Sequence, residues 1–99
     1  MWYAIISQDV ENSLALRKMH RPAHLERLEE LNEQDRVLIA GPHPKADSQT
    51  PDENGFSGSL VVIDFDSLEQ AQDWAAQDPY QLNGVYAQVT VKPFIKVFP

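Results

Sequence analysis

The sequence predicts an α+β fold, in which a four-stranded antiparallel sheet carries two helices on one of its faces. Four segments show the apolar alternation or short apolar run of strands, and two segments have apolar residues at helical spacing. Along the 99 residues these segments follow the order β-α-β-β-α-β, without an internal repeat or a linker. Right-handed crossovers fold that order into the ferredoxin-like arrangement. We therefore expect residues 1–99 to form a single domain.

The first strand is predicted over residues 2–7, which are rich in β-branched and aromatic side chains. Asn12 or Ser13 then caps a helix, because either side chain can accept a hydrogen bond from a free N–H of the first turn. Pro22 lies inside this helix and lacks an N–H, so we expect a short turn before it and a regular helix to about Gln34. The helical spacing is carried by Leu14, Met19, Ala23, Leu25, Leu28 and Leu31.

The middle of the chain predicts two strands joined by a long loop. Residues 37–40 are a continuous apolar run closed by Gly41 and Pro42, which is typical of a strand buried on both faces. Residues 44–58 are polar and rich in proline and glycine, and a loop of this length either covers a functional site or is mobile. Alternation over residues 59–65 indicates the third strand.

The second helix is predicted to begin at Ser67, because Ser67 and Gln70 have the spacing of a capping box. Pro79 disfavours helical geometry at the residue before it. The helix therefore ends at Asp78, and this carboxylate lies at a fixed break in the chain. The buried stripe of the helix consists of Leu68, Ala71, Trp74 and Ala75.

The fourth strand is predicted over residues 85–92, after a turn at 80–83 and a left-handed stop at Gly84. Residues 93–99 form an apolar tail. The alternating Val85, Ala87, Val89 and Val91 leave one apolar face beyond what two helices cover. A second copy of the chain would bury such a face, so we expect a homodimer.

The composition excludes several classes of protein. The formal net charge of -7 opposes binding to nucleic acid or to an anionic membrane surface, and no apolar run is long enough to cross a bilayer. Cysteine is absent, which removes disulfides, thiolate nucleophiles and cysteine-based zinc sites. The N-terminus has the pattern of a strand and not of a signal peptide, so we expect a cytoplasmic protein.

A basic stripe on the first helix is the main candidate for a site. Arg17, His20, Arg21 and His24 follow i, i+3, i+4, i+7 spacing and share one face if the helix continues through Pro22. Such a stripe can bind an anion, and a histidine at the border of the core suits proton transfer. A charged stripe is also the usual pattern of a solvated helix face, and a border histidine is often structural.

The same stripe contains a possible metal site, which we judge to be absent. His20 and His24 have the i, i+4 spacing of a zinc-binding helix. Arg21 stands where a metalloprotease has its glutamate, however, and its charge would repel a cation. We therefore expect neither a metal nor another cofactor.

Six short motifs spread over nearly the whole chain carry a resemblance to a known family. They are Arg21-Pro22-Ala23-His24-Leu25, Ala40-Gly41-Pro42, Gly55-Phe56-Ser57-Gly58-Ser59, Asp78-Pro79-Tyr80, Gly84-Val85-Tyr86 and Val91-Lys92-Pro93-Phe94. In this order they resemble the YciI family of small bacterial proteins. That family is similar in fold to muconolactone isomerases, and the resemblance implies a dimeric α+β barrel.

The resemblance also implies an activity. The family includes dehydrochlorinase-like members that act on chlorinated hydroxyquinol compounds, and a His and an Asp are thought to form its acid-base pair. On this sequence the resemblance implies His24 and Asp78. Both lie roughly 17 to 18 Å along their parallel helices at about 1.5 Å per residue, so the two side chains can meet.

Three hypotheses follow. The first is a cofactor-free lyase or isomerase that acts on a small anionic substrate, with His24 as base or acid and Asp78 as its orienting partner. Arg17 or Arg21 would then clamp the anion, and Gly41 and Ser59 are further candidates for substrate binding. The second hypothesis is a non-catalytic dimeric module that binds a small metabolite in the same pocket. The third, a purely structural dimer, leaves the basic stripe unexplained.

Overall fold

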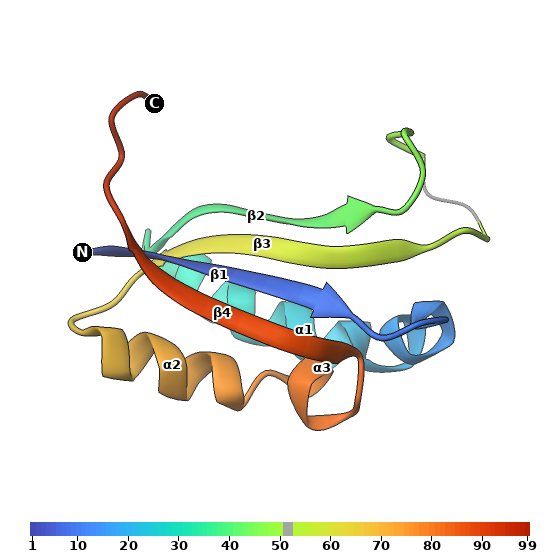
Figure 1. Cartoon of the computed structure of the whole chain (residues 1–99). Coiled ribbons are helices and arrows are strands. Elements are labelled where there is room, and N and C mark those ends of the chain that lie inside the picture. Colours follow the sequence, from blue (N-terminus) through green and yellow to red (C-terminus); the bar gives the residue numbers. More distant parts are fainter. Residues whose placement is uncertain (51–52) are drawn as a thin grey trace.

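The structure is a computed structural model that describes residues 1–50 and 53–99 (Figure 1). Its elements are β1 (Trp2–Asp9), α1 (Leu14–Glu33), β2 (Val37–Pro44), β3 (Phe56–Asp64), α2 (Leu68–Ala76), α3 (Pro79–Leu82) and β4 (Tyr86–Phe94). The predicted β-α-β-β-α-β order is confirmed, with the short helix α3 where a turn was expected. The predicted loop at 44–58 is shorter than expected because β2 and β3 extend into it, and residues 51–52 within it lie outside the described residues.

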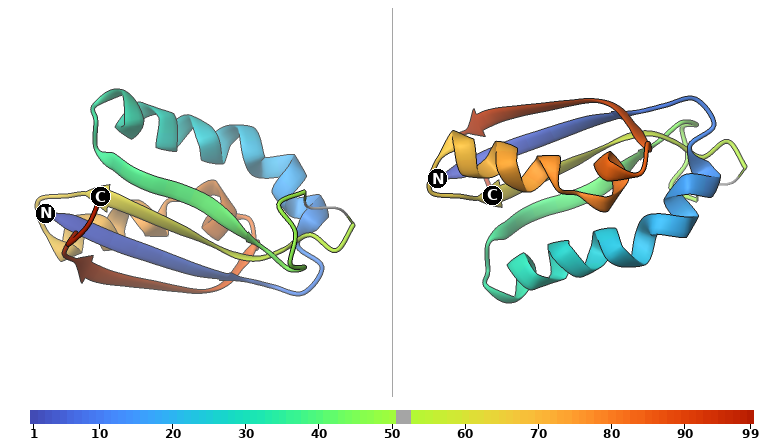
Figure 2. Two further views of the ribbon diagram at one scale, coloured as in Figure 1. Left: turned by 90° about the horizontal axis from the view of Figure 1, so that it is seen from above. Right: turned by 90° about the horizontal axis from the view of Figure 1, so that it is seen from below.

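The four strands form one antiparallel sheet in the order β2-β3-β1-β4. All helices lie on one face of it, with α1 on the β2 side and α2 beneath β1 and β4 (Figures 1 and 2). This is the predicted ferredoxin-like arrangement. The core between sheet and helices consists of Tyr3, Ile5, Leu31, Val61, Ile63, Phe65, Ala71 and Ala75.

Helix α1 is continuous from Leu14 to Glu33, so the predicted turn before Pro22 is wrong. A proline inside a helix removes one i to i−4 hydrogen bond, and here Pro22 lies on the exposed side, where its ring disturbs no packing. Burial of His24 and Leu31 on the other side holds the helix together. Ser13 is the N-cap residue, but its hydroxyl donates to Asp9 instead of accepting from the first turn.

A β-bulge changes which side chains of β4 face the helices. Gln88 pairs with Gln8, but Tyr86 pairs with Asp9, so one extra residue, Ala87, stands opposite the step from Gln8 to Asp9. In a regular strand Ala87 would face the helices and Tyr86 would face away. The bulge instead turns Tyr86 inward, where it is 9% exposed, and leaves Ala87 exposed.

The apolar face predicted from residues 85–91 is therefore wrong. Val89 and Val91 pack against the main core on the helix side, and Val85 lies before the strand in a second buried cluster with Tyr80 and Tyr86. The predicted left-handed conformation of Gly84 is present, with φ 79°.

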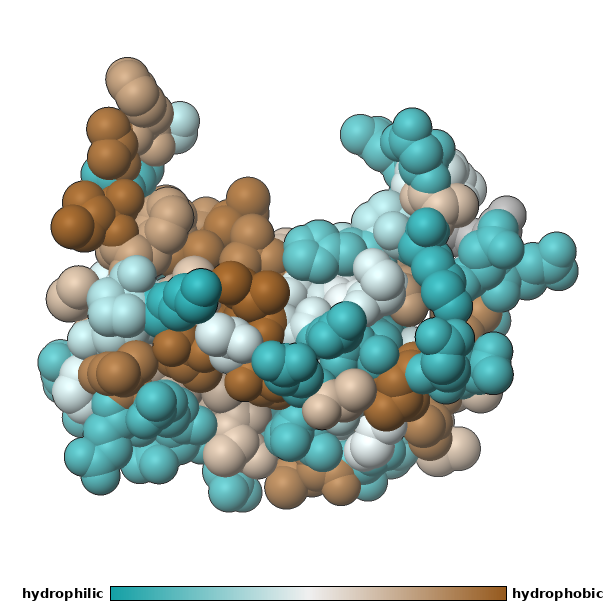
Figure 3. All heavy atoms as spheres, in the orientation of Figure 1, coloured by the Kyte–Doolittle hydropathy of each residue, from teal (hydrophilic) through white to brown (hydrophobic). Residues whose placement is uncertain are grey.

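The face of the sheet turned away from the helices carries the apolar surface instead. The register places five apolar side chains on this face, the outer patch, of which Ile6 and Ile39 are exposed, Leu60 is half-buried, and Ala4 and Val62 are buried. Hydrophobic side chains gather there next to the C-terminal tail (Figure 3). In that tail Ile95, Val97 and Phe98 are each more than three-quarters exposed, at 78%, 77% and 84%.

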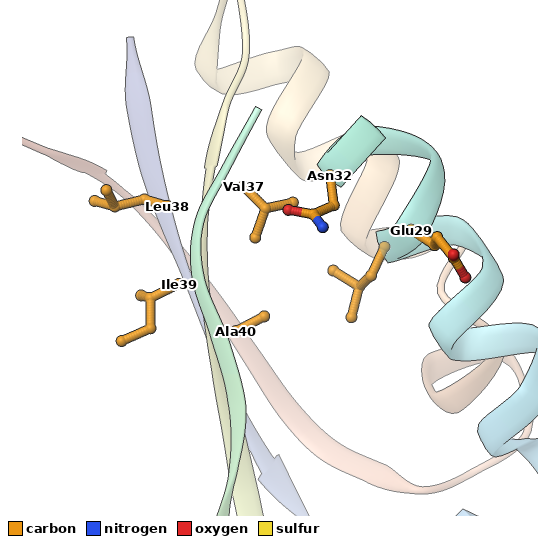
Figure 4. A pocket seen from close by; sticks show the side chains of 7 residues that line it. Glu29, Asn32, Val37, Leu38, Ile39 and Ala40 are labelled. Carbon is orange, nitrogen blue, oxygen red and sulfur yellow. The ribbon is translucent and has the colours of Figure 1, made fainter. Parts of the chain in front are cut away.

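Strand β2 was predicted to be buried on both faces, and this is wrong because β2 is an edge strand. A register shift between Val37 and Ile39 interrupts the usual alternation. Val37 and Ala40 therefore point toward α1, whereas Leu38 and Ile39 point to the other side of the sheet (Figure 4). The continuous apolar run thus reflects this shift and not burial on both faces.

Within the described residues, no helix combines the length and the apolar character needed to cross a bilayer.

Candidate functional site

A cavity of about 760 Å³ lies between α1 and the strands β2 and β3. Its charged lining residues are Arg17, Lys18, Arg21 and Glu53. Its apolar wall includes Leu14, Leu25, Leu28, Pro42, Phe56 and Val61. A shallower groove of about 450 Å³ continues along α1 and β2 past Leu28 and Ala40, toward Asn32 and Val37 (Figure 4). The cavity can therefore hold a small organic molecule between a cationic helix and an apolar sheet.

His24 and Asp78 meet at the wall of this cavity. His24 Nδ1 lies 2.8 Å from Asp78 Oδ1, and both side chains are about nine-tenths buried. An ionised carboxylate can only accept, so Nδ1 carries the proton in this bond and Nε2 is left as the basic nitrogen.

Helix α3 fixes the Asp78 carboxylate. Asp78 is the N-cap of this helix, and its Oδ1 also accepts the backbone N–H of Tyr80 at 2.9 Å. The Tyr80 ring then stacks on the His24 imidazole, with centroids 3.9 Å apart and planes 9° apart. Both the position of the carboxylate and the plane of the imidazole are therefore set by the Asp78-Pro79-Tyr80 turn.

Arg17 is held in a second buried cluster. Its Nε and Nη2 donate to the two carboxylate oxygens of Asp9 at 2.7 and 2.9 Å, and Ser13 donates to the same carboxylate. Burial alone lowers the pKa of Arg17, but the hydrogen bond and charge of Asp9 raise it above its ordinary value. Arg17 is thus a permanent cation whose charge is already neutralised.

The Arg17 guanidinium also joins α1 to β3. Nη2 donates to the Gly58 carbonyl at 3.0 Å and to Ser59 Oγ at 2.9 Å. Its Cζ lies 4.9 Å from the centre of the Phe56 ring and 5.0 Å from that of the Tyr80 ring. Contacts of this kind with two rings favour a buried arginine over a lysine.

Tyr86 completes the polar wall. Its hydroxyl lies 3.0 Å from Ser59 Oγ. Burial raises the pKa of Tyr86 to about 12. Burial likewise raises the pKa of Tyr80. Both phenols therefore keep their protons at neutral pH.

The structure divides the predicted basic stripe. Arg17 and His24 are buried, His20 is half-buried and Arg21 is exposed at the cavity, so these four do not form one solvated face. The other predicted binding residues, Gly41 and Ser59, also line the cavity. No group of three or more His, Asp or Glu side chains placed to hold a metal occurs within residues 1–50 and 53–99.

Several residues of this site were not predicted as such. Asp9 lies just beyond the strand predicted over residues 2–7, and Tyr80 and Tyr86 were named only as members of motifs. No helical or strand periodicity links Asp9 to Arg17, because one lies on β1 and the other on α1. Alternation along β4 also does not indicate Tyr86, because the bulge at Ala87 reverses the side of the sheet that Tyr86 faces. One feature of the sequence could have indicated this ion pair. Asp9 is an acidic residue after an apolar strand, and Arg17 is the first arginine of the helix that follows.

A family model described as the YCII-related domain matches residues 1–95. Protein YciI from Escherichia coli O6:H1 and protein YciI from Shigella flexneri are each 53% identical to this chain over 98 residues, which is 99% of this chain and 100% of each relative. An uncharacterized protein from Haemophilus influenzae is 52% identical over 98 residues, with the same coverage.

A solved structure of 5-chloro-2-hydroxyhydroquinone dehydrochlorinase from Burkholderia phenoliruptrix, in complex with 2,5-dihydroxybenzoquinone, is similar with a TM-score of 0.84. It is 26% identical, and the match covers 96% of this chain and 94% of that chain.

Proposed function

The chain belongs to the YCII-related family, and we propose that it is a lyase or isomerase that transfers a proton on a small anionic substrate through His24 and Asp78. The observation that carries this proposal is the buried hydrogen bond between these two side chains at the wall of a cavity. A similar structure is that of a dehydrochlorinase with a small quinone bound, which supports a reaction of the lyase class.

His24 acts as the base in this scheme. Asp78 holds the proton on Nδ1, so Nε2 can take a proton from the substrate, and the carboxylate then stabilises the imidazolium that forms. The stacked Tyr80 ring keeps the imidazole in one plane throughout. Proton transfer between an imidazole and a substrate requires no further cofactor.

In a lyase reaction the electron pair of the broken substrate–hydrogen bond forms a new double bond, and the leaving group departs with the electron pair of its own bond. The proton held on His24 is then released with the leaving group, so that the sum of the products equals the substrate. In an isomerase reaction His24 returns the same proton to another substrate atom. Both reactions use the same pair of residues.

Arg21 and Lys18 bind the substrate anion, because both are exposed at the cavity. Arg17 contributes less to net attraction, since Asp9 neutralises it, and it acts through Ser59 and the ring contacts. Gly41 lies on the opposite wall. The apolar wall of the cavity suits a planar ring, like that of the quinone bound to the dehydrochlorinase.

The experiment is a screen of the purified protein against chlorinated hydroxyquinols, beginning with 5-chloro-2-hydroxyhydroquinone, and against lactones. Release of chloride or opening or shifting of the lactone at a rate that depends on enzyme concentration is the expected result. Binding by calorimetry without turnover of any compound contradicts the enzyme assignment. That result favours the second hypothesis, a non-catalytic module that binds a small metabolite in the same cavity.

We further propose that two copies pair through the outer patch, giving a homodimer with the helices on the outside. Ile6 and Ile39 of this patch are exposed, at 39% and 57%, and the apolar tail rises on the same side of the sheet (Figure 1). Burying such a surface in a symmetric contact is the usual solution for a small sheet protein. Sedimentation equilibrium should give a dimer, and a stable monomer at micromolar concentration contradicts the pairing.

A further inference from the structure

The Ser59 hydroxyl is surrounded by donors. A serine hydroxyl has one proton to donate and two lone pairs that accept. Arg17 Nη2 lies 2.9 Å from Ser59 Oγ, and a guanidinium can only donate, so it occupies one lone pair. The Tyr86 hydroxyl lies 3.0 Å from the same oxygen, and the direction of this second bond decides where the Ser59 proton points.

Burial of Tyr86 determines that direction. Ser59 faces the helix side of β3 and is 5% exposed, and Tyr86 lies inward on β4 and is 9% exposed. Within the described part of the chain, Ser59 is the hydrogen-bond partner of the Tyr86 hydroxyl. If Ser59 donated to Tyr86, the proton of the Tyr86 phenol would be buried without an acceptor, which is costly.

The opposite direction gives the Tyr86 proton an acceptor. Tyr86 donates to Ser59, and Ser59 accepts from both Tyr86 and Arg17. The high pKa of Tyr86 agrees with this, because a phenol that keeps its proton must place it on an acceptor. The Ser59 proton is then free for the cavity, which Ser59 lines.

We propose that Tyr86 and Arg17 fix the Ser59 hydroxyl as a hydrogen-bond donor to the cavity, so that the site takes substrates that present a carbonyl or oxyanion oxygen there. The substrate class deepens the proposed function and rests on it, since His24 must act on the same molecule. Ser59 would touch the substrate, whereas Tyr86 is a positioning residue that acts through Ser59.

A fixed hydrogen-bond donor at Ser59 would favour the proton transfer proposed for His24. When His24 removes a proton from a hydroxylated ring or from a carbon beside a carbonyl, negative charge collects on a substrate oxygen. A donor that is fixed before the reaction stabilises that charge without reorganisation. Donation from the Arg17 cation and from Tyr86 polarises the Ser59 O–H and strengthens it as a donor.

Neutron diffraction from a crystal of the deuterated wild-type protein without ligand tests the direction of the hydrogen bonds. We expect deuterium on Tyr86 Oη directed at Ser59 Oγ, and the Ser59 deuterium directed at the cavity. Deuterium bound to Ser59 Oγ and directed at Tyr86 would overturn the proposal. This measurement needs neither a substrate nor turnover.

Binding of two matched probes tests the substrate class. The probes are 2,5-dihydroxybenzoquinone and its reduced form, 1,2,4,5-tetrahydroxybenzene, kept under anaerobic conditions. They share one skeleton, but the first has carbonyl oxygens that only accept, and it is an anion at neutral pH whereas the second is neutral. Wild-type protein should bind the quinone at least about tenfold more tightly than the reduced form, because the Ser59 hydrogen bond and the charges of Arg21 and Lys18 all favour it.

Ser59→Ala should reduce this preference about tenfold, which is the part due to the hydrogen bond, and Tyr86→Phe should reduce it about threefold, because the serine proton is then no longer fixed. The double variant should show no further loss beyond Ser59→Ala. A purely structural role would weaken binding of both probes equally, which contradicts the proposal. An undiminished preference in Ser59→Ala, or no binding of either probe to the wild type, also overturns the ligand class.

The two proposals fail separately. Normal turnover by a His24 variant would remove the proposed function while leaving the probe preference intact, because that preference is measured without turnover. Loss of the preference in the wild type would remove the role of Ser59 and leave the acid-base pair of His24 and Asp78 untouched.

Discussion

His24 Nδ1 lies 2.8 Å from Asp78 Oδ1, although the two residues are 54 positions apart in the sequence. The same Asp78 oxygen accepts the N–H of Tyr80 at 2.9 Å and so begins helix α3. One carboxylate oxygen therefore does two things: it holds the imidazole proton, and it caps a helix. The two roles can be separated, because an amide also caps a helix but cannot stabilise an imidazolium by its charge.

Asp78→Asn should therefore lower turnover much more than stability. We expect kcat to fall by roughly 10²-fold to 10⁴-fold, with the free energy of unfolding lowered by about 1 kcal/mol or less. Chemical denaturation beside an activity assay gives both values. Asp78→Ala is the matched control, since it removes the cap as well and should cost about 1 kcal/mol more. A large loss of stability in Asp78→Asn would assign the residue a structural role.

Gly58 marks a close approach between strands. A Cβ built on Gly58 would lie 2.0 Å from the Ser7 carbonyl oxygen, so β1 and β3 would have to separate. Gly58→Ala should lower the free energy of unfolding by about 3 kcal/mol or more, and it should loosen the bond from Arg17 to the Gly58 carbonyl. Gly41→Ala is the control, because a Cβ there meets nothing within 4 Å and is expected to change stability by less than about 1 kcal/mol.

Tyr86 should make the protein sensitive to alkali. Burial raises its pKa to about 12, whereas an unfolded tyrosine titrates near a pKa of about 10. Above pH of about 10 only the unfolded state releases this proton, so the stabilisation is complete below that pH and is lost as the pH rises toward 12, at a cost of about 2–3 kcal/mol. Urea unfolding of wild type and Tyr86→Phe over this range should show a steeper loss for the wild type. Parallel curves would contradict the account.

Ile39→Glu should dissociate the proposed homodimer. The residue lies on the edge strand β2 within the outer patch and is 57% exposed, so a charge there would face the second copy. Leu82→Glu is the matched control, since Leu82 is similarly exposed, at 62%, but lies on helix α3. Sedimentation should give a monomer for the first variant and a dimer for the second. An unchanged dimer in Ile39→Glu would move the interface elsewhere.

The order of elements was predictable because each element has a local cause. Ser67 accepts the N–H of Gln70 as the capping pattern predicts, and Pro79 ends α2 at a fixed break. These features depend on spacing within one element. The contact between His24 and Asp78 was predicted from parallel helices of similar depth, and that argument is wrong although the contact is present. Helices α1 and α2 run in opposite directions, because they follow the antiparallel strands β1 and β3, and the end of α2 meets the middle of α1.

The wrong predictions concern features that depend on contacts between two elements of secondary structure. The bulge at Ala87 depends on pairing with β1, so alternation along β4 alone missed Tyr86. Alternation also cannot say which face of the sheet the helices cover, and Val89 and Val91 lie on that covered face. Packing against the sheet keeps α1 continuous through Pro22, which no local propensity predicts. The pair of Asp9 and Arg17 likewise joins two elements, and it places one member of the predicted basic stripe, Arg17, in a buried cluster where its charge is neutralised.

The most direct test of the acid-base assignment is His24→Gln. Glutamine keeps a hydrogen-bonding end close to Asp78 but cannot exchange a proton, so the variant should fold, keep its oligomeric state and bind 2,5-dihydroxybenzoquinone within about threefold of wild type. Its turnover of whichever chlorinated hydroxyquinol or lactone the wild type converts should fall by at least about 100-fold. Binding and turnover measured on the same preparation decide the matter. Normal turnover by His24→Gln would show that His24 is not the group that moves the proton.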